Sequence, residues 1–377
     1  MVNRILSLFL VFIISLTCIP VVACGADISV SADSAVVMIA DTGQVVYEKN
    51  AHEKRGMAST TKIMSSVVAI ENGDIYSKIK VLFEDINVEG TSLGLKEGDT
   101  VDLLSLIKGM LISSGNDSAN VTATLVAGNK DGFVEMMNLK ARELGMDSTS
   151  FKNPSGLTEE GHYSTAYDMA LLGSYAIKNK LFRDICSSLV CTVSFGDPVT
   201  QREISNHNRF LSMYEGAFGI KTGFTKASGR CLVTAAVRDG ITLVAVTLNA
   251  PDDWNDHIRM MDYAFGRVRL HSISIDCPYV DVVGSQKSRI GTRILRSIYI
   301  PYVDVVPAYT VSFFTDKFVY AGISADDYIG YVDIAFSDRQ FIREYLVSSE
   351  GAEIDVKEPS DMTFLEKVKK FLRKGLS

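Results

Sequence analysis

The chain has 377 residues, of which 47% are hydrophobic and 22% charged, and its formal net charge is −7 at pH 7. A chain of this length can form two domains with a substantial core, and its composition is that of a globular protein, not a disordered one. The acidic balance excludes nucleic acid as the main partner, because binding a phosphate backbone requires a basic surface.

The N-terminus has the pattern of a secretory signal peptide over residues 1–23, with cleavage after Ala23 or as late as Ala26. Arg4 precedes a continuous apolar run, and small residues follow it. Two alternatives stay open. An uncleaved membrane anchor is one, since the run approaches spanning length; a lipoprotein acylated at Cys24 is the other, since Val-Val-Ala-Cys resembles a lipobox. Each predicts an exported chain at the outer face of the cell membrane or in the cell wall.

The next elements predict an α/β (α+β) domain over residues 27–268. Residues 34–50 read as a hairpin around Asp41-Thr42-Gly43, and Arg238-Asp239-Gly240 reads as a tight turn between two later strands. Strands at both ends of a helical middle favour an antiparallel sheet packed against a helical cluster. The helical patterns cover residues 63–72, 102–111 and 131–145, and the strand patterns cover 216–223, 231–238 and 241–250.

Two smaller segments complete the chain. Short β-rich runs without a helical period predict a small all-β domain at 269–356, a spacer or a binding platform. Residues 357–377 predict an amphipathic helix with apolar and basic faces, suited to lie on a membrane surface. A surface helix docked on its own domain is the alternative. The apolar positions of this helix are Phe364, Leu365, Val368, Phe371 and Leu372.

The cysteines do not indicate a metal site. Cys186 and Cys191 could close a small loop in an oxidising compartment, but a chain of this size needs no such staple, and free buried thiols are favoured for these two, for Cys231 and for Cys277. No Cys-x-x-Cys pair or histidine-rich cluster is present in the sequence. We therefore expect no metal site.

A serine and a lysine at the start of the first helical pattern are candidates for catalysis. If the helix begins near Ser59, Lys62 lies on the same face and its amine can reach the hydroxyl. The helix N-terminus favours developing negative charge. A lysine with its ordinary pKa of about 10.4 is a poor base, so burial or a second cation must lower that pKa. The same spacing at Ser77 and Ser105 lacks this context.

Two further motifs supply groups that such a serine needs. Ser114-Gly115-Asn116 follows a helical run and breaks it at the glycine, which predicts a hydroxyl and an amide exposed in a loop. Lys221-Thr222-Gly223 ends an apolar strand, where a lysine and a hydroxyl side by side can bind a carboxylate and the glycine lets a ligand approach the backbone.

Together and in this order, the three motifs resemble those of the low-molecular-weight penicillin-binding proteins that are D-alanyl-D-alanine carboxypeptidases, with Ser-Gly-Asn in place of Ser-Asp-Asn. The resemblance covers nearly the whole mature chain and includes the segments "MASTTKIM", "SSGNDSAN", "FKNPSGLTEEGHYSTAYDMALL", "NHNRFL" and "GIKTGFTKASGRCLV". It implies a penicillin-binding, β-lactamase-like transpeptidase fold and a reaction that needs no metal or cofactor. The implied partners are peptidoglycan pentapeptides ending in D-Ala-D-Ala and β-lactams.

The resemblance also implies roles for the motif residues. Ser59 attacks the carbonyl between the two D-alanines, Lys62 takes its proton, and Ser114 relays that proton to the leaving amine. Asn116 holds the substrate backbone, Lys221 adds positive charge, and Thr222 helps to bind the terminal carboxylate. The backbone N–H groups of Ser59 and Phe224, beside Gly223, form the oxyanion hole.

The sequence departs from the family at two positions. Well-known members have histidine where this chain has Phe224, which offers only its backbone there. Some members place an arginine after the last strand to bind the carboxylate, and the segment around Trp254 offers no evident substitute. The remaining polar candidates, His162, His207, Asp117, Asp168 and Glu143, are expected to serve in structural hydrogen bonds, caps or ion pairs.

Three other functions stay possible from the sequence. A serine β-lactamase would share the nucleophile, but its deacylating Glu-x-x-Leu-Asn segment is absent between the second and third motifs. A D,D-endopeptidase would use the same chemistry with another leaving group. A catalytically inactive wall-binding protein is disfavoured by the intact motifs.

Overall fold

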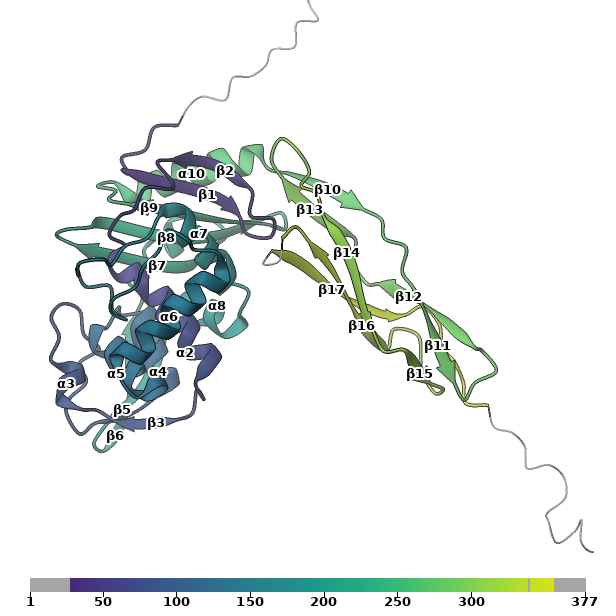
Figure 1. Cartoon of the computed structure of the whole chain (residues 1–377), viewed down its shortest axis with the longest axis horizontal. Helices are drawn as coiled ribbons and strands as arrows, with labels where there is room; N and C mark the ends of the chain where they lie inside the picture. The colour runs from purple at the N-terminus through teal and green to yellow at the C-terminus, as the bar shows by residue number, and fades with distance from the viewer. Residues whose placement is uncertain (1–27, 338–339, 356–377) are drawn as a thin grey trace, which may run out of the picture.

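The computed structural model describes residues 28–337 and 340–355. The expected signal peptide, Cys24 and the amphipathic helix expected at 357–377 lie outside these residues. Figure 1 shows a body of helices and sheet followed, from β10 onward, by an elongated region of strands. No helix in the described part is long and apolar enough to cross a membrane.

A five-stranded antiparallel sheet in the order β2-β1-β9-β8-β7 forms the centre of the first body. Strand β1 is buried along its whole length, so both faces of the sheet are covered. Its alternate residues enter two separate apolar clusters, Val36 and Met38 on one side and Val37 and Ile39 on the other. The strands are β1 (Ser34–Ile39), β2 (Val45–Lys49), β7 (Ala217–Thr225), β8 (Gly229–Arg238) and β9 (Ile241–Leu248).

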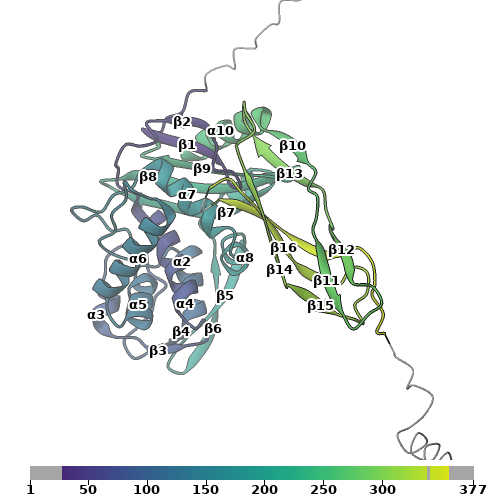
Figure 2. The same cartoon turned by 45° about the vertical axis from the view of Figure 1, so that its right-hand side comes forward.

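Helix α10 (Asp253–Arg267) covers one face of this sheet, with short α9 (Phe210–Met213) beside it, and a cluster of helices covers the other face (Figure 2). The cluster consists of the 3-10 helix η1 (Ala58–Thr61), α2 (Lys62–Asn72), α3 (Phe83–Ile86), α4 (Leu103–Leu111), α5 (Asn116–Ala127), α6 (Lys130–Leu144), α7 (Ala166–Ala176) and α8 (Lys180–Cys186).

Local sequence signals set several of these helix ends. Asp102 caps α4 by accepting from the backbone N–H of Ser105 at 2.7 Å. Helix α6 ends at Gly145, which takes the left-handed conformation at φ 73° that residues other than glycine rarely adopt. The predicted helix end at Asn72, the hairpin of β1 and β2, and the two-residue turn between β8 and β9 are confirmed.

A second, four-stranded sheet packs at the edge of the helical cluster in the order β3-β4-β5-β6. Its strands are β3 (Lys78–Lys80), β4 (Thr100–Asp102), β5 (Val190–Gly196) and β6 (Val199–Ser205). Cys186 and Cys191 lie near this sheet as free thiols, and Cys231 and Cys277 are also free. Cys186 and Cys231 are buried, as expected, whereas Cys191 and Cys277 are half-buried.

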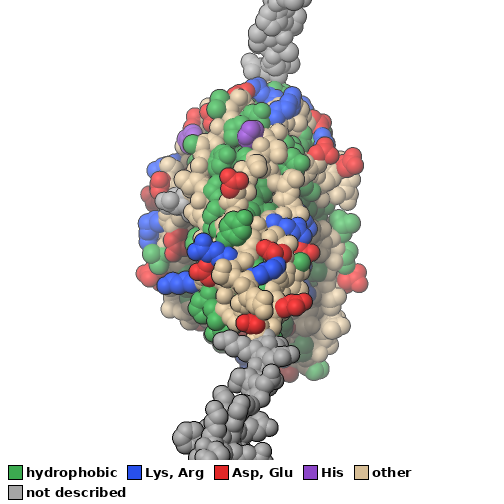
Figure 3. Space-filling view, turned by 90° about the vertical axis from the view of Figure 1, so that its right-hand side faces the viewer, with side chains coloured by type: hydrophobic (Ala, Val, Ile, Leu, Met, Phe, Trp, Pro, Cys, Tyr) green, Lys and Arg blue, Asp and Glu red, His purple; other side chains and the backbone are tan. Residues whose placement is uncertain are grey.

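The region after α10 is built from strands, which confirms the prediction of an all-β C-terminal part. A six-stranded sheet in the order β14-β16-β17-β12-β11-β15 packs beside the β10-β13 pair. Figure 3 shows this side of the molecule, with a band of hydrophobic side chains exposed between charged ones. The strands are β10 (Arg269–Ile273), β11 (Tyr279–Val283), β12 (Arg289–Ile294), β13 (Ile298–Tyr302), β14 (Thr310–Thr315), β15 (Phe318–Tyr320), β16 (Tyr328–Ala335) and β17 (Phe341–Ser348).

Candidate active site

Ser59 lies in η1, one turn before the regular helix, so the predicted helix start near Ser59 is a 3-10 turn that continues into α2 at Lys62. The turn is entered through Ala58, whose φ of 47° is left-handed. Gly156 allows this arrangement, because a Cβ atom on Gly156 would lie 2.0 Å from the carbonyl oxygen of Ala58. The segment around Gly156 therefore packs directly against the turn that carries Ser59.

Lys62 is fully buried, and its amine reaches three oxygen atoms. Nζ lies 3.0 Å from Ser59 Oγ, 2.7 Å from Asn116 Oδ1 and 2.6 Å from the carbonyl oxygen of Ser155. Burial lowers the pKa of Lys62 well below its ordinary value, and the charge of Lys221 lowers it further, whereas Asp117 raises it. Burial, more than Lys221, is thus the main reason why this amine loses its proton readily.

The second motif lies between α4 and α5. Ser114 is buried with a left-handed φ of 62°, a conformation uncommon for a residue other than glycine. The predicted exposed loop is wrong for Asn116, which is the buried first residue of α5 after Gly115 as its N-cap. Besides its contact with Lys62, the Asn116 amide donates to the carbonyl oxygen of Glu89 at 2.7 Å. One N–H of that amide is not used in these two contacts.

The third motif lies on β7, the edge strand of the central sheet. Lys221 is buried, which lowers its pKa to about 7, and its Nζ donates to the carbonyl oxygen of Thr222 at 2.9 Å. A Cβ atom on Gly223 would lie 3.0 Å from the backbone nitrogen atoms of Ser59 and Thr60. Glycine at this position therefore lets β7 pass close to η1. Phe224 is exposed at 64% of its surface, beyond that contact.

A cavity of about 290 Å³ opens beside Ser59 and is walled by residues from all three motifs. Ser59, Ser114, Thr222, Gly223 and Phe224 reach it, whereas Lys62, Asn116 and Lys221 lie behind its wall. The complete lining is Ser59, Thr91, Ser114, His207, Thr222, Gly223, Phe224, Arg230, Asp253 and Trp254. Of these, Thr91, Arg230 and Asp253 were not predicted from the sequence.

One contact of Lys62 was also missed as a part of the site. The carbonyl oxygen of Ser155 accepts from Lys62, and a backbone acceptor cannot be predicted from a pattern of residue types.

His162 has a structural role. Its Nδ1 accepts from the Lys152 backbone N–H at 3.0 Å, so Nε2 carries the proton that it donates to Thr61 Oγ1 at 2.9 Å. Burial lowers the pKa of His162 to about 4, which keeps it neutral and in the expected structural role.

Asp117, Asp168 and Glu143 make the expected structural contacts, and His207 in addition lines the cavity. Asp117 accepts from Ser92 Oγ at 2.6 Å and from the backbone N–H groups of residues 93–95, which fixes the loop that carries Thr91. Asp168 accepts from Thr149 Oγ1, and Glu143 pairs with Lys140. His207 lies in the cavity wall, where burial and Lys221 lower its pKa.

The chain is similar to known proteins in sequence and in fold. A family model described as D-alanyl-D-alanine carboxypeptidase, peptidase family S11, matches residues 21–252. The D-alanyl-D-alanine carboxypeptidase DacF of Bacillus subtilis is 34% identical over 290 residues, which is 72% of this chain and 73% of that protein.

Two solved structures extend the comparison. The D-alanyl-D-alanine carboxypeptidase DacD of Francisella tularensis covers 90% of this chain and 98% of its own, with 25% identity and a TM-score of 0.64. A mutant of the Streptomyces K15 DD-transpeptidase covers 64% of this chain and 100% of its own, with 28% identity and a TM-score of 0.61. With the serine, the lysine and the Lys-Thr-Gly strand around one cavity, this chain belongs to the D-alanyl-D-alanine carboxypeptidase family of penicillin-binding serine peptidases.

Proposed function

We propose that the chain releases the terminal D-alanine of peptidoglycan stem peptides through an acyl-enzyme on Ser59, with Lys62 as the base. The observation that carries this assignment is the position of Lys62 Nζ, 3.0 Å from Ser59 Oγ and in contact with two carbonyl oxygens. The carboxypeptidase activity follows from the family, and the residue roles are our assignment.

The two carbonyl contacts set the direction of proton transfer. A neutral amine has two N–H donors and one lone pair. The Asn116 Oδ1 and Ser155 carbonyl oxygens can only accept, so they take both donors. The lone pair is then left for the Ser59 hydroxyl, which donates to it. Burial, which lowers the pKa of Lys62, favours this neutral form.

The reaction divides into two steps. Ser59 Oγ bonds to the carbonyl carbon of the penultimate D-alanine while its proton passes to Lys62. The C–N bond then breaks, and Ser114 relays a proton to the departing D-alanine amine. A water molecule next attacks the ester, its proton returns through Lys62, and the Ser59 hydroxyl is restored. The positive charge of Lys221 favours the donation of the proton through Ser114 to the departing amine.

The backbone N–H groups of Ser59 and Phe224 are our assignment for the oxyanion hole. The close approach of β7 to η1 at Gly223 supports it, because it brings both backbone segments to one side of the cavity. Fixed N–H donors of this kind stabilise the negative charge that develops on the carbonyl oxygen. Asn116 and Thr222 complete the assignment by holding the substrate backbone and its terminal carboxylate.

We also propose that the enzyme acts outside the cytoplasm, after export by the signal peptide at residues 1–23. Residues 357–377 would then rest on the membrane surface through their apolar face. Lipidation at Cys24 is the alternative attachment. Mass spectrometry of the chain from its native membrane distinguishes cleavage after Ala23 or Ala26 from acylation, and removal of residues 357–377 should release the cleaved form from the membrane.

The experiment that tests the assignment measures D-alanine release from diacetyl-L-Lys-D-Ala-D-Ala and covalent labelling by a fluorescent penicillin. Ser59→Ala should abolish both. Ser66→Ala is the matched control, because Ser66 is a buried serine of α2 whose Oγ makes no hydrogen bond within the described residues. Equal D-alanine release and labelling in Ser59→Ala would refute the assignment. Rapid release of hydrolysed penicillin would indicate a β-lactamase instead.

A further inference from the structure

We propose that Arg230, held by Asp253, binds the terminal carboxylate of the substrate and makes the enzyme select peptides with a free C-terminus over cross-linked ones. The inference rests on the proposed function and deepens it, since it concerns which substrates reach Ser59.

Arg230 lines the cavity together with Thr222, the residue assigned above to the substrate's terminal carboxylate. It stands directly opposite Phe224 in the β7–β8 ladder, so both side chains project from the same face of the sheet. Thr222, two residues before Phe224, shares that face. Arg230 and Thr222 both line the cavity that contains Ser59. A cation and a hydroxyl are thus presented to the same space.

Asp253 fixes the position of the Arg230 guanidinium. Its Nε and Nη2 both donate to Asp253 Oδ1, at 3.0 Å and 2.8 Å. The Asp253 side chain is only 4% exposed, whereas that of Arg230 is 43% exposed. Both residues line the cavity, but the guanidinium presents far more of its surface to a ligand than the carboxylate does. Because a guanidinium has five N–H donors, the contacts with Asp253 leave Nη1 and one N–H of Nη2 for a ligand.

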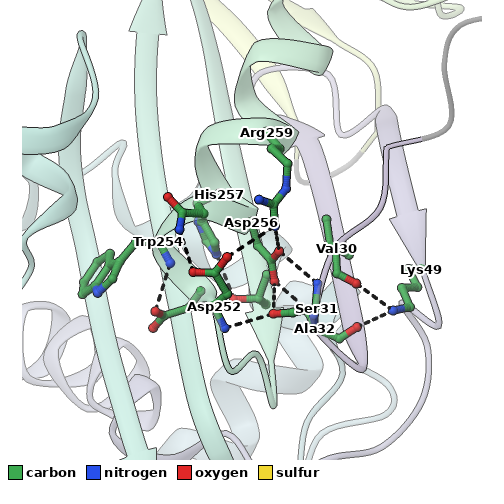
Figure 4. A network of polar contacts seen from close by, with 12 residues as sticks. Val30, Ser31, Ala32, Lys49, Asp252, Trp254, Asp256, His257 and Arg259 are labelled. Atoms are coloured by element: carbon green, nitrogen blue, oxygen red, sulfur yellow. Dashed lines mark hydrogen bonds and ion pairs between the residues drawn. The ribbon is translucent and has the colours of Figure 1, made fainter.

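The start of α10 holds Asp253 and Trp254 in place. The Trp254 ring lies 5.8 Å from the guanidinium, a cation–π contact that adds to the fixation of Arg230. Figure 4 shows Trp254 directed away from a polar network on the other side of the same helical turn. In that network Asp256 accepts from the Ser31 backbone N–H at 2.9 Å and from the Ala32 backbone N–H at 3.0 Å.

This geometry distinguishes a free carboxylate from a peptide-bonded one. A carboxylate can accept two parallel N–H bonds from a guanidinium and a third from the Thr222 hydroxyl. A D-alanine whose carboxyl group is joined to another residue carries no charge and cannot replace these bonds. The same reasoning applies to the carboxylate of a penicillin. Arg230 therefore favours the carboxypeptidase reaction over the endopeptidase reaction at the same serine.

The test compares kcat/KM for diacetyl-L-Lys-D-Ala-D-Ala with kcat/KM for its C-terminal amide. The wild-type chain should prefer the acid. Arg230→Gln should lower kcat/KM for the acid by about 10- to 100-fold, mainly through KM, the range expected for lost charge-assisted hydrogen bonds. Hydrolysis of the amide should be unchanged, so the preference disappears. Arg230→Lys should keep part of the preference for the acid, because lysine keeps the positive charge but lacks the bidentate donors of the guanidinium.

Arg238→Gln is the matched control, because Arg238 lies on the same strand, is 40% exposed and makes an ion pair with Asp262 outside the cavity. It should keep the wild-type preference. The proposal would be overturned if Arg230→Gln lowered kcat/KM equally for the acid and the amide while thermal unfolding stayed unchanged. It would also be overturned if kcat/KM for the acid did not change. If the wild-type chain released no D-alanine and labelled no penicillin, the proposed function itself would fail.

Discussion

Two lysine side chains lie almost without solvent contact behind the cavity, and the catalytic assignment requires them in opposite protonation states. Lys62 serves as an acceptor and must be neutral, whereas Lys221 contributes through its charge. Both amines have pKa values lowered by burial, and for Lys62 the charge of Lys221 adds to the effect. The pair therefore makes a site competent for catalysis at the expense of folding stability.

Replacing Lys221 with methionine should stabilise the folded chain at low pH. The pKa of Lys221 is about 7 in the folded state and 10.5 ordinarily, so between these values the unfolded chain binds more protons. Wild-type stability thus rises with pH across this window. Lys221→Met should be more stable below pH 7 by an amount on the order of a few kcal/mol, and the difference should shrink toward pH 10. Urea unfolding across this range measures it; a pH-independent difference would contradict it.

The same substitution should shift the pH dependence of the acylation rate to higher pH. Since the charge of Lys221 lowers the pKa of Lys62, removing that charge raises the pKa of Lys62. With Lys62 as the proposed base, acylation requires its neutral form, so the rate in Lys221→Met should begin to rise at a higher pH than in the wild type. Single-turnover acylation by a fluorescent penicillin as a function of pH reports the midpoint. A midpoint that stays in place or moves down would show that the two amines are not coupled.

At the scale of elements, the site depends on how closely β7 passes η1. Gly223→Ala would place a Cβ atom 3.0 Å from the Ser59 and Thr60 nitrogen atoms, so strand and turn must separate. Because the proposed oxyanion donors lie on these two elements, acylation should slow by about 100-fold or more. Gly266→Ala in α10 is the control, since nothing lies within 4 Å of its added Cβ atom. Acylation at the wild-type rate in Gly223→Ala would show that the oxyanion hole does not depend on the contact between β7 and η1.

Much of this arrangement could be predicted from sequence, because it depends on short-range signals. The Ser59–Lys62 spacing, the helix end at Gly145 and the turn at residues 239–240 follow from residue types a few positions apart. Gly115 misled the prediction for Asn116, since glycine occurs both after a helix and as an N-cap. The break was in fact the junction of two helices.

Other parts of the site depend on contacts between distant segments and had no signal of their own. The Ser155 carbonyl reaches Lys62 across 93 positions of the chain, and a backbone oxygen has no residue-type signature. Arg230 begins an ordinary-looking strand, and only the register with Phe224 and the start of α10 brings it to the cavity. Strand register of this kind is set by tertiary packing and cannot be read from one sequence.

At the scale of the whole molecule, the described site residues all precede the all-β region. They lie between residues 59 and 254, and the shorter Streptomyces structure matches 64% of this chain. A chain that ends at residue 268 should therefore keep kcat/KM on a soluble tripeptide within about threefold. It should unfold at a lower temperature, since Gln44 loses its hydrogen bonds with Val303 and Val305. Loss of activity in a folded truncated chain would assign the region a role in catalysis.

The network in Figure 4 also limits how the chain can be matured. Asp256 is buried and accepts from Ser31 and Ala32, so the first described residues form part of the support beneath Asp253 and Trp254. Leader removal after Ala23 or Ala26 leaves this support whole. A protease that trimmed the new N-terminus past Ser31 would leave a buried carboxylate without these donors and loosen the rim of the cavity, although no residue of that rim had been cut. If Arg230 binds the substrate carboxylate as proposed, the N-terminal boundary of the mature enzyme would affect substrate recognition through this support.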